Sequence, residues 1–355
     1  MKSPSKELLI KFNSMLEGVV GMSLFLKSVN ESEQINAGKD ELRPRLGVSA
    51  CLLGKQVRFD GGHKKNSFIL NELSEHADFV SMCPELEAGF GLPRPTMQLR
   101  QLGEEVRLVF SKDPTKDVTD KLDTYSKNKT KQLGDLDGFI FKKDSPSCGV
   151  YRVPVVIHKD GFKNREGVGL FAKSFMETHP LVPVEEEGRL NDAALCENFF
   201  ERVYAYKRWK QIEQVESNIQ GFIEFHSQHK LLLMSRGSHF YQELGRIVAG
   251  TTLKDLHERR EKYIKRFMEV MKVQSERGRQ VNVLQHIMGY LKNEISSGDK
   301  QELLNVFEAY RQKQMPLITP VTLLRHHLRV YPQPYIAKQH YLSPFPEKLA
   351  LRSSL

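Results

Sequence analysis

The chain has 355 residues, 39% of them hydrophobic and 27% charged, and a formal net charge of +9. This length is sufficient for two domains of ordinary size. The most apolar early stretch, residues 18–26, is far shorter than the roughly 20 residues that a membrane span requires. No small-residue cleavage site follows it, so we expect a cytoplasmic protein with no membrane partner.

The positive charge is concentrated in the C-terminal part of the chain. Residues 201–355 contain 25 Lys and Arg but 15 Asp and Glu, a net charge of +10, whereas residues 1–200 have a net charge of −1. A basic region of this kind admits an acidic partner such as RNA or DNA, although many basic domains bind neither.

Residues 1–43 are predicted to form an N-terminal extension and linker, with one short helix at 7–16. Over residues 44–190, short apolar runs alternate with helical patterns. Strands are predicted at 46–51, 78–83, 104–111 and 138–143. Helices are predicted at 67–77, 117–136 and 167–180. Strands that alternate with helices indicate an α/β domain with a mainly parallel sheet.

From residue 191 the pattern changes to successive long helices that continue to about residue 330, and strand patterns are almost absent. We therefore predict an all-α helical bundle domain over 191–355. The tail from Tyr331 carries four prolines and is expected to run over the surface.

Three features of the helical region have a plain structural interpretation. Cys196 lies in an amphipathic helix and is expected to pack in the core. His226 and His229 have the spacing of metal ligands, but no third ligand is near, so a polar helix face is the better interpretation. The charged segment 257–267 could contact phosphate, but a solvated face is the commoner outcome.

The three other cysteines each follow a predicted strand. Cys51 ends the first strand, Cys83 ends the second, and Cys148 lies just beyond the strand at 138–143. Parallel strands share a carboxyl edge, and ligands bind in the crevice outside that edge. We therefore expect the three thiols to meet in one cleft.

Three thiolates without a fourth cysteine nearby suit a metal centre with an open coordination position. A cubane iron–sulfur cluster uses one cysteine per iron, so three cysteines leave one iron free to act as a Lewis acid. A catalytic zinc with three cysteine ligands is the alternative, and the residues alone do not decide between the two.

Four segments of the first domain resemble, in this order, the thiouracil desulfurase-like family: VSACLLGKQVRFDGG, CPELEAGFGLPRPTMQL, DVTDKL and KKDSPSCGVY. The likeness runs from about Leu46 to Glu187. The helical segment FIEFHSQHKLLLMSRGSHFYQELGRIV resembles a second, uncharacterised domain that is often fused to the first.

The resemblance implies a 4Fe–4S cluster held by Cys51, Cys83 and Cys148. In the family, the uncapped iron takes the sulfur of a thiocarbonyl while water replaces it at carbon. This exchange needs no redox change, so neither nicotinamide nor flavin is implied. The resemblance also gives Glu85 the acid/base role and makes Ser145 the active-site serine. The stretch RPTMQL departs from the resemblance, because a more acidic stretch is expected after the proline.

The residues themselves give Glu85 two interpretations. Departure of sulfur requires proton transfer, and a carboxyl group two residues from Cys83 is well placed to provide it. The alternative is a solvated loop carboxylate.

Two serines and an aspartate are candidate substrate contacts. Ser145 and Ser147 flank Pro146, where their hydroxyls would bind either a substrate carbonyl or the backbone of the turn itself. Asp60 would either orient the substrate or cap the glycine turn that follows it.

The sequence thus predicts an iron–sulfur-dependent desulfurase that acts hydrolytically on a thiolated nucleobase such as 2-thiouracil and releases the oxo base and sulfide. One alternative is a non-catalytic iron–sulfur sensor that binds nucleic acid through its basic helical domain. Another is an RNA-modifying enzyme whose C-terminal domain binds RNA.

Overall fold

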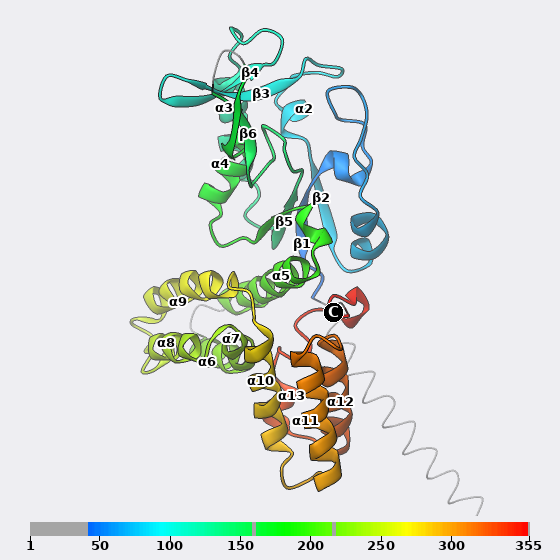
Figure 1. Cartoon of the computed structure of the whole chain (residues 1–355). Coiled ribbons are helices and arrows are strands. Elements are labelled where there is room, and N and C mark those ends of the chain that lie inside the picture. Colours follow the sequence, from blue (N-terminus) through cyan, green and yellow to red (C-terminus); the bar gives the residue numbers. More distant parts are fainter. Residues whose placement is uncertain (1–41, 158–160, 215–217, 354–355) are drawn as a thin grey trace, which may run out of the picture. The chain divides into compact units, whose positions relative to one another are not determined.

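The computed structural model describes residues 42–157, 161–214 and 218–353 (Figure 1). The predicted N-terminal extension, with its helix at 7–16, lies outside the described residues. From Pro44 onward the chain forms one compact unit. The division of this unit into domains at residue 190 stays a prediction.

The first sheet has four parallel strands in the order β2-β1-β5-β8. The strands are β1 (Arg45–Ser49), β2 (Asp78–Met82), β5 (Gly138–Phe141) and β8 (Val184–Glu186). All of β5, and all of β1 after its first residue, is buried, as is usual for parallel strands covered on both faces. Three of the four predicted strands lie in this sheet.

The second sheet has the order β4-β3-β6-β7 and is mixed: only β3 and β6 pair in parallel. Its strands are β3 (Met97–Leu102), β4 (Glu105–Phe110), β6 (Val153–Val156) and β7 (Lys163–Gly167). The sequence pattern predicts only β4. It misses β6 and β7 because one is short and contains a proline, and the other is polar throughout. The predicted α/β class is confirmed, with this mixed sheet in addition.

Two helices of the N-terminal region are shorter than predicted: α3 (Thr119–Thr130) and α4 (Leu170–Thr178). α4 packs on β5 through aromatic rings, because Phe139 and Phe141 stack on each other at 3.8 Å and meet Phe171 and Phe175 edge-on. The helix predicted at 67–77 is irregular, with a π turn at Phe68–Glu72 and a 3-10 turn at Leu73–Glu75.

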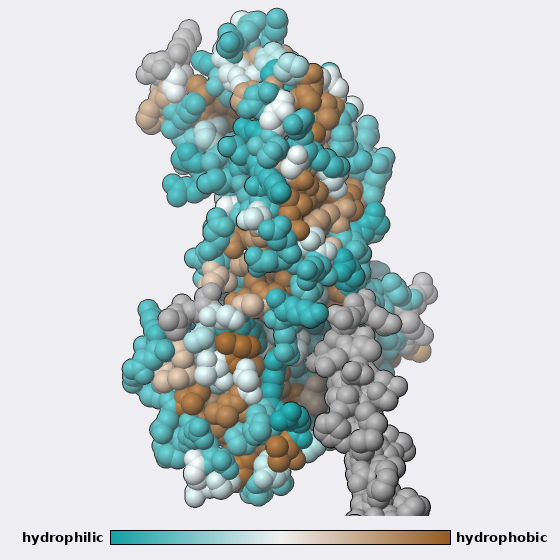
Figure 2. Space-filling view, turned by 90° about the vertical axis from the view of Figure 1, so that its right-hand side faces the viewer, coloured by the Kyte–Doolittle hydropathy of each residue, from teal (hydrophilic) through white to brown (hydrophobic). Residues whose placement is uncertain are grey.

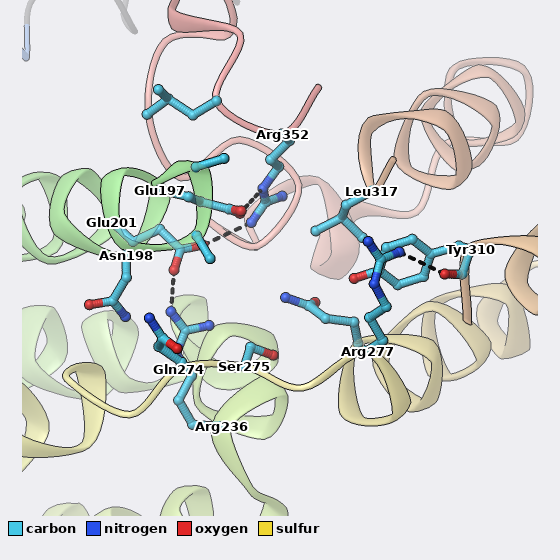
Figure 3. Close-up of a pocket in the computed structure, with 14 residues that line it drawn as sticks. Glu197, Asn198, Glu201, Arg236, Gln274, Ser275, Arg277, Tyr310, Leu317 and Arg352 are labelled. Atoms are coloured by element: carbon cyan, nitrogen blue, oxygen red, sulfur yellow. Dashed lines mark hydrogen bonds and ion pairs between the residues drawn. The ribbon is translucent and has the colours of Figure 1, made fainter. Parts of the chain in front are cut away.

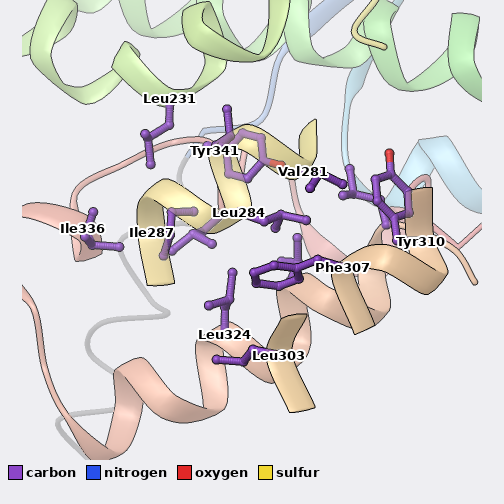
Figure 4. Packing of buried hydrophobic residues seen from close by; sticks show 14 of the residues in the cluster. Leu231, Val281, Leu284, Ile287, Leu303, Phe307, Tyr310, Leu324, Ile336 and Tyr341 are labelled. Atoms are coloured by element: carbon purple, nitrogen blue, oxygen red, sulfur yellow. The ribbon is translucent and has the colours of Figure 1, made fainter. Parts of the chain in front are cut away.

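The C-terminal region is helical, as predicted (Figure 1). Its helices are α5 (Ala193–Glu213), α6 (Ile219–Gln228), α7 (Lys230–Arg236), α8 (Ser238–Val248), α9 (Leu256–Met271), α10 (Arg277–Tyr290), α11 (Ser297–Arg311), α12 (Ile318–Val330) and α13 (Pro334–Ala337). One apolar cluster joins α7, α10, α11 and α12 to the C-terminal tail (Figure 4). A second joins α5, α6, α8 and α9.

The tail does not run over the surface, so that prediction is wrong. Ile336, Tyr341, Leu342 and Phe345 are all buried, and Figure 4 shows Ile336 and Tyr341 among the side chains of the first cluster. The prolines break the helices, but the apolar residues between them still pack in the core.

His226 of α6 and His229, which directly follows α6, do not form a polar face either. His226 stacks on Tyr241 with ring centroids 4.6 Å apart, and its Nδ1 lies 3.1 Å from the Tyr263 hydroxyl. His229 is fully buried and its Nδ1 donates to the Phe225 carbonyl at 2.7 Å. The aromatic partners, which lie elsewhere in the sequence, provide the apolar environment.

The charged segment 257–267 is largely a self-paired face. Arg259 pairs with Asp255, and Lys265 with Glu261, each four residues apart on α9. The Arg266 guanidinium binds Glu243 of α8. Few of these charges remain available for a phosphate.

Helix α5 also contacts the segments that lead into β2 and β5 of the first sheet. Its Lys207 and Lys210 reach the buried Asp137 carboxylate, at 3.1 and 2.7 Å. The Tyr204 hydroxyl donates to the His76 carbonyl at 3.2 Å.

No helix in the described part of the chain is both long and apolar enough to cross a membrane. Figure 2 shows one face of the molecule, on which hydrophilic residues separate small apolar patches.

Candidate active site

A cavity of about 370 Å³ lies at the carboxyl edge of the first sheet, and all three predicted cysteines line it. Cys51 is in the 3-10 turn that follows β1, Cys83 comes directly after β2, and Cys148 is in the loop after β5. The topology therefore brings together thiols that are 32 and 65 residues apart in the sequence. Cys196 is buried in α5, does not line this cavity, and packs as predicted.

Burial dominates the electrostatics of these thiols. It is the main reason that the pKa of Cys51 is raised to about 11, an effect that Lys142 opposes and the neighbouring Cys83 reinforces. Burial also raises the pKa of Cys83, and it raises that of Cys148 well above the usual range. Among the residues that the structure describes, no three His, Cys, Asp or Glu side chains are placed to hold a single metal ion.

The turn that carries Cys83 is held by Glu87. Pro84 opens the short helix α2 (Pro84–Glu87), and the Glu87 carboxylate accepts from the Cys83 amide at 3.0 Å. The same carboxylate accepts from the Tyr125 hydroxyl of α3 at 2.6 Å. Sequence reasoning missed this contact, although the signal for it, a carboxylate four residues after the cysteine, is present in the sequence.

Glu85 is paired on both of its oxygens. Arg94, which is 7% exposed, donates from Nε to Glu85 Oε2 at 2.9 Å and from a second nitrogen to the same oxygen. The Ser147 hydroxyl donates to Oε1 at 2.8 Å. Glu85 lines the cavity with only 15% of its side chain exposed, so it is not a solvated loop carboxylate.

Arg94 is a site residue that sequence reasoning missed, although it lies in the stretch that departs from the expected motif. Its Nη1 also donates to the Val57 carbonyl at 3.1 Å. The guanidinium therefore connects the Glu85 turn to the loop after β1.

The two serines have different surroundings. Ser145 lines the cavity, and its hydroxyl accepts from the amides of Ser147 and Cys148, at 3.2 and 3.0 Å. Ser145 thus shapes the turn that carries Cys148, which is one of its two predicted roles. Ser147 is fully buried, does not line the cavity, and directs its hydroxyl at Glu85.

Asp60 lies outside the cavity lining. Its carboxylate accepts from the Gly62 amide at 3.0 Å, and this bond, together with a more distant Arg58, lowers its pKa. The arrangement matches the turn-capping alternative.

Gly169 allows the loop of Cys148 to approach helix α4 closely. A Cβ atom at this position would lie 2.5 Å from the Ser147 carbonyl carbon and 2.8 Å from the Cys148 amide nitrogen. The amides of Phe171 and Ala172 donate to the Ser147 carbonyl at 3.0 and 3.1 Å. The first turn of α4 therefore fixes the loop.

The cavity wall is basic. Arg58, Lys64 and Lys143 line it, and within the described residues no carboxylate lies at ion-pair distance from Lys64 or Lys143. Of the two carboxylates in the lining, Glu85 pairs with Arg94 and Asp144 pairs with Arg165. Lys64 and Lys143 are thus available to a negatively charged group of a ligand, such as a phosphate.

Two known families match different regions of the chain. Residues 46–187 match the family described as 2-thiouracil desulfurase. Residues 230–346 match a family described as a protein of unknown function, DUF1722. The chain belongs to the 2-thiouracil desulfurase family and carries a DUF1722 region fused behind it.

Two relatives and one solved structure are similar to parts of the chain. Uncharacterized protein YbgA of Escherichia coli K12 is 25% identical over 47% of this chain and 96% of its own length. Uncharacterized protein YbbK of Bacillus subtilis 168 is 33% identical over 29% of this chain and 71% of its own length. The solved [4Fe-4S]-dependent thiouracil desulfidase TudS is 27% identical over 44% of this chain and 98% of that chain, with a TM-score of 0.36.

Proposed function

We propose that the protein removes sulfur from a thiolated nucleobase such as 2-thiouracil by hydrolytic cleavage of the C–S bond, giving the oxo base and sulfide. The observation that carries the proposal is one cavity, in the region that matches the desulfurase family, lined by three cysteines and a fixed carboxylate. Residues 44–190 would form the catalytic domain.

The donor set fits a 4Fe–4S cluster held by Cys51, Cys83 and Cys148. Three thiols from three separate loops face one cavity, and the lining contains no fourth cysteine. The contact of Cys83 Sγ with the Val57 carbonyl is weak, at 3.7 Å, so it would not hold this thiol back from a metal. When bound, the cluster would supply an iron without a cysteine ligand as a Lewis acid for the departing sulfur.

Glu85 would move the proton that this exchange requires. Arg94 and Ser147 fix its carboxylate at the cavity wall, so it needs no reorganisation when the substrate enters. Ser145 would keep the Cys148 loop in shape and present its hydroxyl to the base. Asp60 would support the loop at the mouth and leave the substrate contact to its neighbours.

The decisive experiment is anaerobic purification followed by iron and sulfide analysis and assay with 2-thiouracil. We expect about four irons and four acid-labile sulfides per chain. Cys51→Ser, Cys83→Ser and Cys148→Ser should each empty the site, and Cys196→Ser is the matched control that should not. Stoichiometric zinc without sulfide would contradict the cluster.

The role of Glu85 has its own test. Glu85→Gln keeps the size of the side chain and its bond to Arg94 but removes the base, so turnover should fall by roughly 10²-fold or more with the cluster spectrum unchanged. Ser145→Ala should act in the same direction. Wild-type turnover in Glu85→Gln would remove this residue from the mechanism.

A second candidate substrate, a thiolated nucleotide within RNA, is favoured by the basic cavity wall. Lys64, Lys143 and Arg58 would face its phosphates, and the net charge of +10 in residues 201–355 would add attraction. Comparison of kcat/KM for free 2-thiouracil and for an RNA that contains 2-thiouridine decides between them. An intact cluster with no turnover of either, together with salt-dependent DNA binding, would favour the sensor alternative.

A further inference from the structure

A second cavity lies in the helical region and shares no lining residue with the cysteine cavity. It has a volume of about 180 Å³ and lies between α5, α7, α10, α11 and the C-terminal segment (Figure 3). Its charged lining residues are Glu197, Glu201, Arg236, Arg277 and Arg352.

Both carboxylates in this cavity are already neutralised. Arg352 donates to Glu197 at 2.7 Å and to Glu201 at 2.9 Å, and Arg236 pairs with the second oxygen of Glu201. Figure 3 shows Arg352 reaching these carboxylates from the C-terminal segment and Arg236 reaching Glu201 from the end of α7. Two arginines therefore satisfy two glutamates.

Arg277 is the cation left over. Its Nη1 donates to the carbonyl oxygens of Tyr310 at 2.7 Å and Met315 at 3.4 Å, and the guanidinium lies over the Tyr310 ring at 4.7 Å. Within the described residues no carboxylate is at ion-pair distance from it. The cavity thus has one uncompensated positive charge.

Arg236 adds an unused donor. The residue is only 2% exposed, and its Nε has no hydrogen-bond partner in the described chain. A buried N–H donor without a partner lowers the stability of the protein. Binding of an acceptor from outside the chain would remove this cost.

We propose that this cavity binds a small oxyanion, either inorganic phosphate or the carboxylate of a small organic acid, through Arg277 and Arg236. The volume corresponds to about six water molecules, which is room for such a group. The polar side chains of Gln274 and Ser275, which also line the cavity, would complete the contacts. Because this site is separate from the cysteines, it does not depend on the proposed desulfurase activity.

Isothermal titration of the full-length protein with sodium phosphate and, separately, with sodium acetate tests the proposal at constant ionic strength. Saturable binding of phosphate alone or of acetate alone identifies the source of the oxyanion, and mutual competition shows that both use one site. Absence of saturable binding of either ion would overturn the proposal.

Arg277→Gln should weaken binding by tenfold or more, because the uncompensated charge is lost. The matched control is Arg311→Gln, which removes the same charge from an exposed ion pair on α11 outside the cavity and should leave affinity within twofold. Arg277→Lys keeps the charge and should recover part of the affinity. Equal binding by Arg277→Gln and the control would mean that the ions bind elsewhere, and the site would be rejected.

Discussion

Arg94 and Glu85 form a buried ion pair next to a cysteine, and each depends on the other. The side chains are 3% and 15% exposed, so water screens the pair poorly. Removal of the guanidinium would leave a desolvated carboxylate with only the Ser147 hydroxyl as a partner. We therefore expect Arg94 to be a positioning residue whose loss would affect both folding and the proposed reaction.

We expect Arg94→Met to cost about 3 kcal/mol of unfolding free energy, because it leaves one partner of a buried pair uncompensated. Adding Glu85→Gln to this variant should restore part of the loss, since the remaining group is then neutral. Urea denaturation of the single and double variants measures the effect. Arg311→Met, in an exposed pair, is the control and should change stability by less than about 1 kcal/mol. Strictly additive losses in the double variant would contradict the pairing.

The positions of the three cysteines were predictable, whereas the partners of Glu85 were not. Each cysteine follows an apolar strand, and the shared carboxyl edge of parallel strands then decides where it lies. Arg94 reaches Glu85 across a loop of irregular backbone, and Ser147 reaches it from 62 residues away. No periodic pattern encodes such contacts, because they depend on loop conformation.

At the scale of elements, helix α4 supports the loop of Cys148 through Gly169. The helix has no side-chain cap, and the carbonyls of the loop bind its first amides instead. These hydrogen bonds require the backbone of the loop to lie closer to residue 169 than any side chain at that position would allow. The glycine is thus explained by packing.

Gly169→Ala should lower the unfolding free energy by about 2 kcal/mol or more, because the new Cβ meets backbone atoms that cannot move aside. If the loop shifts, the iron content of the anaerobically purified protein should fall as well. Gly278→Ala on α10 is the control: its Cβ would meet nothing within 4 Å, and helix propensity favours alanine by about 1 kcal/mol. An unchanged melting temperature in Gly169→Ala would show that the close contact between Gly169 and the Cys148 loop does not affect stability.

The buried side chains of His226 in α6 and of His229, just after it, make the helical region sensitive to acid. Burial lowers the pKa of His226 to about 4 and that of His229 to about 3, where nearby Arg208 contributes. Both values lie below the roughly 6.5 of an unfolded chain, so the unfolded state binds protons first as pH falls. Their contribution to stability is complete above pH 6.5 and is lost progressively below it.

His229→Gln should therefore reduce the loss of stability between pH 7 and pH 4.5 by on the order of 2 kcal/mol. The variant is expected to be less stable than wild type at pH 7, because a packed ring is lost. Urea midpoints at both pH values measure the difference, with the exposed His326→Gln as control. Identical pH dependence in His229→Gln and wild type would rule out this histidine as the source.

Element patterns predicted the first sheet well and the second poorly. Strands β1, β2 and β5 are apolar runs, and such runs can be recognised as strands in the sequence. The polar strand β7 becomes a strand only because β6 is beside it. Such edge strands are determined by tertiary pairing, which single-sequence patterns do not contain.

In the molecule as a whole, α5 belongs to both parts of the chain. Lys207 and Lys210 bind the buried Asp137, which directly precedes β5, while Trp209 packs against Phe222 of α6. A cut near residue 187 would remove both lysines from Asp137, and a cut after α5 would expose Trp209. Truncation is therefore a poor way to separate the reaction from RNA binding, and full-length charge variants are required.

If RNA binds across the cysteine cavity and the basic helical region, affinity should fall steeply with salt, because each phosphate contact releases a counterion. Lys64→Gln with Lys143→Gln removes the two cavity lysines that lack a carboxylate partner in the described chain. This variant should flatten the slope of log K against log salt by about 1 for each lost contact. Turnover of free 2-thiouracil should stay near the wild-type value, since a neutral base gains little from these charges.

Filter binding of tRNA at several salt concentrations measures the slope. Lys127→Gln with Lys265→Gln is the matched control, because it removes the same charge from exposed i, i+4 ion pairs away from the cavity. Equal slopes in the two double variants would assign the attraction to net charge alone. If the wild-type protein does not bind tRNA, the RNA substrate is rejected and the free base remains as the proposed substrate.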